Sequence, residues 1–183
     1  GIGVQRSLVR SGRFLLSANG RFSAPIEQSI GKEAGIGLSI RRSGRVPAEF
    51  LVERRAALDK GARNAVAVLF ATGIDDFRLP GKIRVSAYGQ AGVVGLKNRD
   101  KFVDVAVRAE RGLLTLGRAD IRLGAVVAGA SQPGVSRLDL GPSLTGRFRV
   151  AGTSVRVATE WRERIAGNAQ PGSGPTVTLG FDY

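Results

Sequence analysis

The sequence predicts an all-β protein of about ten antiparallel strands. Three observations indicate this class. From about Arg13 onward, successive stretches alternate between apolar and polar side chains, which is the two-residue period of a strand. Clusters of turn-forming residues separate these stretches. The chain also contains 26 Gly and seven Pro in 183 residues without a collagen-like repeat, as is typical of turn-rich β-proteins.

The predicted strands follow one another along the chain. They are expected at 14–22, 35–41, 48–52, 65–71, 82–95, 103–109, 120–127, 137–150, 155–165 and 176–183. Residues 1–12 leave three interpretations open, namely a further strand, a strand cut from a larger barrel and a loose terminus. Ten strands are therefore expected between Arg13 and Tyr183, within a single domain over 1–183.

The alternation is clearest at 137–150. One parity, mostly apolar, consists of Leu138, Leu140, Pro142, Leu144, Gly146, Phe148 and Val150. The other parity consists of Arg137, Asp139, Gly141, Ser143, Thr145, Arg147 and Arg149. A helix would spread both sets around its axis, so the pattern indicates a strand with one apolar and one polar side.

Two segments are ambiguous. The stretch 47–60 also fits an amphipathic helix, because Pro47 suits a first helical position and Glu49 and Glu53 are four residues apart. We expect a strand there because the neighbouring segments are strands. The stretch 65–71 is apolar at both parities, and we expect a strand that ends before Gly73.

The connections between the predicted strands are short. They fall at 97–100, 129–135, 150–153 and 167–174, which suits a meander with neighbouring strands paired in order. The segments 131–134 and 170–174 are expected to be turns, because neither precedes a helix nor carries the lysine of a phosphate-binding loop.

The composition excludes most catalytic chemistry. Histidine and cysteine are absent, which removes the common general base, thiolate nucleophiles and the usual transition-metal ligands. No Asp or Glu pair stands apart from expected arginine partners, so we expect no enzyme activity, cofactor or metal site. Methionine is also absent, and we expect Gly1 to follow a removed signal peptide or to begin a piece of a longer protein.

The polar parity carries charges of both signs. A formal charge of +13 points toward an anionic partner. No apolar run approaches the roughly 18 residues of a membrane-spanning helix, so any span would use strands. Because enclosed charges need partners, arginine mixed with acidic residues favours a transmembrane up-and-down barrel with its charged side inside. Twelve strands, or part of a larger barrel, are the alternatives to ten.

The candidate lumen residues belong to this charged parity. The predicted anion-contacting arginines of the lumen are Arg84, Arg108, Arg122, Arg147, Arg149, Arg156, Arg162 and Arg164. Their predicted acidic partners are Asp104, Asp120, Asp139 and Glu160. The predicted membrane-interface aromatics are Trp161, Phe181 and Tyr183, because amphipathic rings favour the membrane–water boundary.

The chain ends in TVTLGFDY, with alternating apolar residues and a terminal aromatic. This ending resembles the C-terminal strand signal of bacterial outer-membrane β-barrels, including the C-terminal barrels of exopolysaccharide-secretion or phage-adsorption proteins. The resemblance implies a location in the outer membrane. It also implies membrane lipid, lipopolysaccharide and the barrel assembly machinery as partners, and an acidic polysaccharide as a candidate ligand.

Two functions remain open at this stage. The first is a passive pore or portal for anions or an acidic polymer, or else a barrel filled by paired charges with a structural role. The alternative is a soluble basic β-protein that binds nucleic acid or another polyanion, for which net charge is the main argument. Stacking aromatics are sparse, so nucleic acid is not the expected partner.

Overall fold

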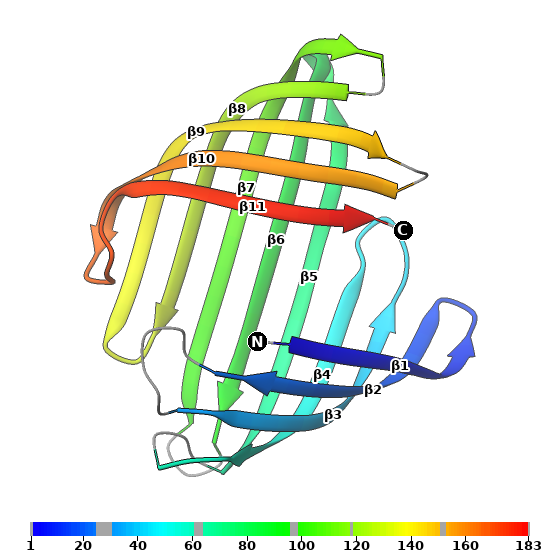
Figure 1. The fold of residues 1–183 in the computed structure, drawn as a ribbon, viewed down its shortest axis with the longest axis vertical. Helices are drawn as coiled ribbons and strands as arrows, with labels where there is room; N and C mark the ends of the chain where they lie inside the picture. The colour runs from blue at the N-terminus through cyan, green and yellow to red at the C-terminus, as the bar shows by residue number, and fades with distance from the viewer. Residues whose placement is uncertain are drawn as a thin grey trace. The chain divides into compact units, whose positions relative to one another are not determined.

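Eleven β-strands account for most of the described chain. The computed structural model describes residues 2–24, 31–60, 64–95, 99–117, 119–150 and 153–182. The strands are β1 (Ile2–Ser11), β2 (Phe14–Ser23), β3 (Glu33–Arg42), β4 (Ala48–Ala57), β5 (Ala65–Leu79), β6 (Ile83–Val94), β7 (Asp100–Leu116), β8 (Ala119–Gln132), β9 (Val135–Val150), β10 (Thr153–Gly167) and β11 (Gly174–Asp182) (Figure 1). The all-β class is confirmed, and β2–β11 are the ten strands expected after Arg13.

The strands form one sheet in which each pairs with its neighbours in the chain. Every pair with a described register is antiparallel. Within the described residues β1 and β11 are the edges and do not pair, so the sheet is open and the closed barrel expected from the sequence is absent. In a meander of eleven strands the first and last run in the same direction, so antiparallel pairing cannot join them.

The ambiguous segment after Pro47 is a strand. β4 pairs antiparallel with β3 on one side and β5 on the other, with Phe50 opposite both Ile40 and Phe70. Two-sided pairing satisfies the backbone groups of β4, and its apolar side chains meet apolar neighbours. Tertiary pairing therefore outweighs the helical signals, and the strand prediction is confirmed.

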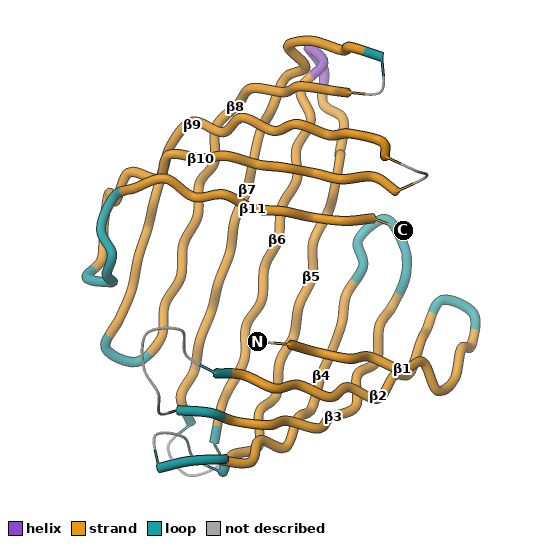
Figure 2. The backbone as a smooth tube through the Cα atoms, viewed as in Figure 1, coloured by secondary structure: helices purple, strands orange, loops and turns teal. Residues whose placement is uncertain are grey.

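The prediction that the strand at 65–71 ends before Gly73 is wrong. β5 continues to Leu79 and is followed by a single 3-10 turn, Pro80–Lys82, drawn in purple in Figure 2. Gly81 in this turn has a φ of 78°, which favours glycine. Gly73 is thus an ordinary strand residue, and the true stop is the Pro-Gly pair further along.

The chain divides into two compact units. Unit 1 comprises residues 1–73 and 89–103, and unit 2 comprises residues 74–88 and 104–183. Within unit 2, β8, β9, β10 and β11 lie side by side in order (Figure 1). The β8–β9 hairpin closes through Pro133 and Gly134, whose φ of 78° again suits glycine.

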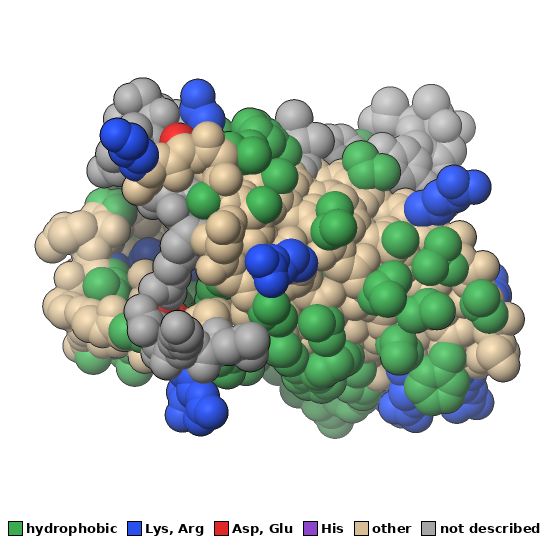
Figure 3. Space-filling view, turned by 90° about the horizontal axis from the view of Figure 1, so that it is seen from below, with side chains coloured by type: hydrophobic (Ala, Val, Ile, Leu, Met, Phe, Trp, Pro, Cys, Tyr) green, Lys and Arg blue, Asp and Glu red, His purple; other side chains and the backbone are tan. Residues whose placement is uncertain are grey.

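Exposure follows strand parity, with the apolar side exposed. On β9, Leu140 and Leu144 are 44% and 47% exposed, whereas Asp139 and Thr145 are fully buried. Among the described residues the buried apolar side chains are small, namely Ala65, Ala67, Val126, Ala128 and Ala158. Figure 3 shows hydrophobic side chains across the surface in view, with scattered Lys and Arg among them. This is the reverse of burial in a water-soluble protein.

No helix in the described ranges is long and apolar enough to cross a membrane.

Candidate functional site

Buried carboxylates organise the charged side of the strands in unit 2. Asp139 of β9 is fully buried between two arginines. Its Oδ2 lies 2.5 Å from Nη2 of Arg137, and its Oδ1 accepts a 2.6 Å hydrogen bond from Nε of Arg164. Arg164 also donates to the backbone carbonyls of Ala169 and Pro171. Each group therefore has partners, which is what allows a buried charge to persist.

Glu160 of β10 is held in a similar way. The side chain is buried, and Nε of Arg108 on β7 donates to its Oε1. Nε of Arg162 donates to the second oxygen, Oε2, at 2.9 Å. Both carboxylate oxygens are thus paired with guanidinium groups, and charge-assisted bonds of this kind are stronger than neutral ones.

A third network joins β5, β6 and β8. Asp76 accepts hydrogen bonds from Arg84 and, at 2.6 Å, from Nη1 of Arg122. Nη2 of Arg122 also lies 2.7 Å from Oδ2 of Asp120. Arg122 is buried, so its two carboxylate partners offset the cost of removing its charge from water.

The fourth network is less complete. Arg147 and Arg156 stand directly opposite each other in the register of β9 and β10. They share Asp75, which lies 3.0 Å from Nη2 of Arg147 and 3.5 Å from Nη1 of Arg156, and which is 55% exposed on its side chain. Nε of Arg147 and both Nε and Nη2 of Arg156 are buried without a hydrogen-bond partner among the described residues. Paired arginines with unused donors are suited to binding an anion.

Unit 1 contains a separate and better satisfied network. Arg21 of β2 contacts Glu33 at 2.6 Å and the buried Glu53 at 3.1 Å. Arg55 adds a 2.8 Å contact to Glu53. Two carboxylates face two guanidinium groups here, so the network carries no net charge.

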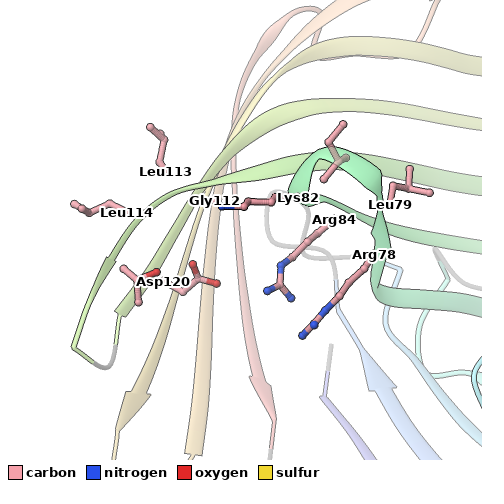
Figure 4. A pocket seen from close by; sticks show the side chains of 10 residues that line it. Arg78, Leu79, Lys82, Arg84, Gly112, Leu113, Leu114 and Asp120 are labelled. Atoms are coloured by element: carbon pink, nitrogen blue, oxygen red, sulfur yellow. The ribbon is translucent and has the colours of Figure 1, made fainter.

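Two pockets lie beside the charged residues of unit 2. The larger, about 530 Å³, is lined by residues of β5, the 3-10 turn, β6, β7 and β8. Figure 4 shows Arg78 and Arg84 extending in the same direction from its wall, with Asp120 contributed by β8. The smaller, about 350 Å³, includes Arg147 together with the hydroxyl residues Thr115 and Ser154. Arg147 of the unsatisfied pair therefore adjoins open space.

Most of the predicted charged residues lie on the buried or half-buried side of their strands. Arginines with a carboxylate partner are Arg84, Arg108, Arg122, Arg147, Arg156, Arg162 and Arg164. Of the predicted acidic partners, Asp120, Asp139 and Glu160 contact arginine, and Asp104 is half-buried on the same parity. The side chain of Arg149 lies outside the described residues.

The predicted interface aromatics can be placed only in part. Trp161 is 49% exposed, and its Nε1 donates a 3.2 Å hydrogen bond to Glu163. The side chain of Phe181 and the whole of Tyr183 lie outside the described residues. The exposed ring with a polar anchor suits an apolar–polar boundary, which stays a prediction.

Sequence reasoning missed Asp75, Asp76 and Glu110. Asp75 and Asp76 were missed because the strand predicted at 65–71 was expected to end before Gly73, and both lie beyond that point. Glu110 is buried and accepts hydrogen bonds from Ser143 Oγ at 2.9 Å and Thr145 Oγ1 at 2.6 Å. Glu110 is even-numbered, like the charged residues Asp104 and Arg108 before it. Extending the alternation one residue beyond 109 would therefore have included it.

The part of the chain that the structure describes contains no group of three or more acidic side chains placed to hold a metal ion. Comparison with known proteins returned no matching family model, no matching curated protein and no matching solved structure.

Proposed function

We propose that this chain forms the wall of a β-barrel in a bacterial outer membrane, with the charged side of its strands facing the interior. The observation that carries the proposal is the reversed burial. Large side chains such as Leu140 and Leu144 are exposed, while Asp139 and Glu160 are buried among arginines. Exposed apolar surface on this scale is unfavourable in water and favourable in lipid, at roughly 25 cal/mol per Å².

Strand length supports the same proposal. A strand crossing a membrane needs about 9–11 residues. The shortest strand, β11, has 9 residues, β1 to β4 have 10 each, and β7 has 17. Every strand is therefore long enough to cross the hydrocarbon layer.

The proposal requires the open sheet to close into a barrel. Bacterial outer-membrane barrels have an even number of antiparallel strands, and the described sheet has eleven. Antiparallel closure would require a further strand beside β1 or β11. A twelve-stranded barrel or a larger one satisfies this requirement.

The proposed activity is a passive pore or portal for anions or an acidic polymer. It is supported by the arginines on the charged side of β9 and β10. A structural barrel filled by paired charges is the second form of the proposal, because most of these arginines contact carboxylates. Conductance across a planar bilayer with anion selectivity would favour the pore, and a sealed barrel would favour the structural form.

The proposed partners follow from the location. They are outer-membrane lipid and lipopolysaccharide around the barrel, the barrel assembly machinery during insertion, and an acidic polysaccharide as a candidate ligand. Binding of the assembly machinery to the full chain, compared with a variant carrying Leu179→Asp in the exposed apolar row of β11, would test the insertion signal.

Solubility and gel behaviour separate the membrane proposal from its alternative, a soluble basic β-protein that binds nucleic acid. A membrane barrel is expected to be extracted only with detergent and to migrate differently in a gel before and after heating. A protein that stays soluble without detergent and binds DNA in a salt-sensitive way would overturn the proposal.

A further inference from the structure

Arg147 and Arg156 are forced together by the strand register. They occupy directly opposing positions on β9 and β10 and share one side of the sheet. Like charges placed opposite each other on adjacent strands repel, and this destabilises the pair. The sheet therefore holds two guanidinium groups in a position that an additional anion would stabilise.

The single shared carboxylate satisfies this pair poorly. Asp75 is more than half exposed, and its contact with Arg156 is 3.5 Å, long for a charge-assisted hydrogen bond. By contrast, all three guanidinium nitrogens of Arg164 donate hydrogen bonds, the longest of 3.0 Å. The two arginines are thus the least satisfied pair on the charged side of β9 and β10 within the described residues.

The unused donors are specific atoms. Nε of Arg147 and both Nε and Nη2 of Arg156 are buried and lack hydrogen-bond partners in the described chain. A buried donor without a partner loses the hydrogen bond that it would make with water, and the cost is greater when the donor is charged. Three such donors at one place would be satisfied by a ligand that accepts several hydrogen bonds.

The neighbouring space suits such a ligand. The pocket of about 350 Å³ includes Arg147, Arg122, Thr115 and Ser154 in its wall, together with Asp120, whose carboxylate is paired with Arg122. Arginine and hydroxyl groups together are typical of sites that bind a tetrahedral oxyanion, because guanidinium forks pair two oxygens and hydroxyls donate to the others.

We propose that Arg147 and Arg156 form a binding site for the phosphate group of a ligand, with Asp75 as an internal competitor. The site deepens the proposed function, on which it rests for its position inside a barrel. Phosphate binding itself needs only the folded sheet. The two proposals can therefore fail separately.

Binding of inorganic phosphate to the detergent-solubilised full chain tests the site. Titration calorimetry is expected to detect saturable binding that weakens about tenfold or more in Arg147→Gln and in Arg156→Gln, since each removes a charge-assisted pair. Arg137→Gln is the matched control, because it removes the same charge from β9 but leaves Asp139 paired with Arg164. Circular dichroism would verify that each variant is folded.

Asp75→Asn provides the sharper test. Removing the competing carboxylate is expected to tighten phosphate binding, whereas a residue with only a structural role would weaken it or leave it unchanged. Absence of binding in both the unmodified chain and Asp75→Asn would overturn the site. Equal weakening in Arg137→Gln and Arg156→Gln would overturn it as well, because net charge would then be sufficient.

Competition identifies the source of the phosphate. Displacement of inorganic phosphate by a soluble sugar phosphate would support a transported or polymeric ligand, and displacement by phosphatidic acid in the micelle would support a lipid headgroup. Phosphate binding by a chain that proves soluble without detergent would leave the site standing and overturn the barrel.

Discussion

Asp139 depends entirely on its arginine neighbours. It is fully buried, and Arg137 and Arg164 approach its two oxygens from β9 and β10. An ion pair of this kind adds little net stability when intact, but losing one member leaves buried charge without a partner. Substitution of Asp139 is therefore expected to lower the stability of the fold.

Asp139→Asn is expected to lower the free energy of unfolding by about 3 kcal/mol, because two guanidinium groups lose their common charged partner. Urea unfolding of the chain refolded into lipid vesicles would measure this. Glu163→Gln is the control, since Glu163 is exposed, and it should change the free energy by no more than about 0.5 kcal/mol. Similar losses in both variants would contradict the prediction.

Gly141 lies where β9 packs closely against β10. An added Cβ would overlap the backbone carbonyl oxygen of Trp161 on β10. Gly141→Ala is therefore expected to lower stability by about 1–3 kcal/mol in the same unfolding assay. Gly20→Ala, where nothing lies within 4 Å of the added atom, should be neutral or slightly stabilising. Equal stability of the two variants would argue against contact at Gly141.

The parity of individual residues could be predicted from the sequence, but their partners could not. Alternation placed Asp139, Arg147 and Glu160 on one side of their strands, and this is where they lie. The partner Asp75 depends on how far β5 extends, and the opposition of Arg147 and Arg156 depends on register. Register is fixed by pairing between strands, which the alternation within one strand does not encode.

At the scale of elements, the sequence predicted the presence of each strand better than the positions of its ends. The strand after Pro47 was predicted against its helical signals, because flanking strands supply both of its neighbours. β5 and β7 were predicted too short, since they continue past Gly73 and past 109. Glycine inside a strand is compatible with pairing, and a break in the pattern is therefore a weak stop signal.

The exposed side of β9 offers an element-level prediction. Leu144→Lys is expected to lower stability in a bilayer by about 2–4 kcal/mol if the residue lies near mid-membrane, because a charge replaces an apolar group in hydrocarbon. Folding yield in vesicles and urea unfolding would measure the loss. Gln132→Lys, exposed beside the β8–β9 turn, is the control and should have little effect. Improved solubility of Leu144→Lys without detergent would indicate that this side faces water.

For the whole molecule, the decisive feature is whether the two edge strands of the sheet are paired on their outer sides. β1 and β11 each pair on one side only within the described residues. Unpaired edges are templates for association and are usually covered or closed in stable proteins.

Hydrogen exchange of the protein in detergent micelles would test edge closure. If a barrel closes, amides of β1 and β11 should be protected as strongly as those of β2 and β10, because each would donate to a neighbouring strand. Rapid exchange at alternate residues of both edge strands would instead indicate a sheet that remains open.

Each strand of the described sheet pairs only with strands next to it in the chain, and this affects how such a protein can change in length. Each hairpin adds to the sheet without threading past an earlier segment, because the spatial order equals the order in the chain. Duplication or loss of one hairpin would change the number of strands in the sheet while preserving the registers of the remaining strands. The architecture is thus suited to growth by whole hairpins during evolution.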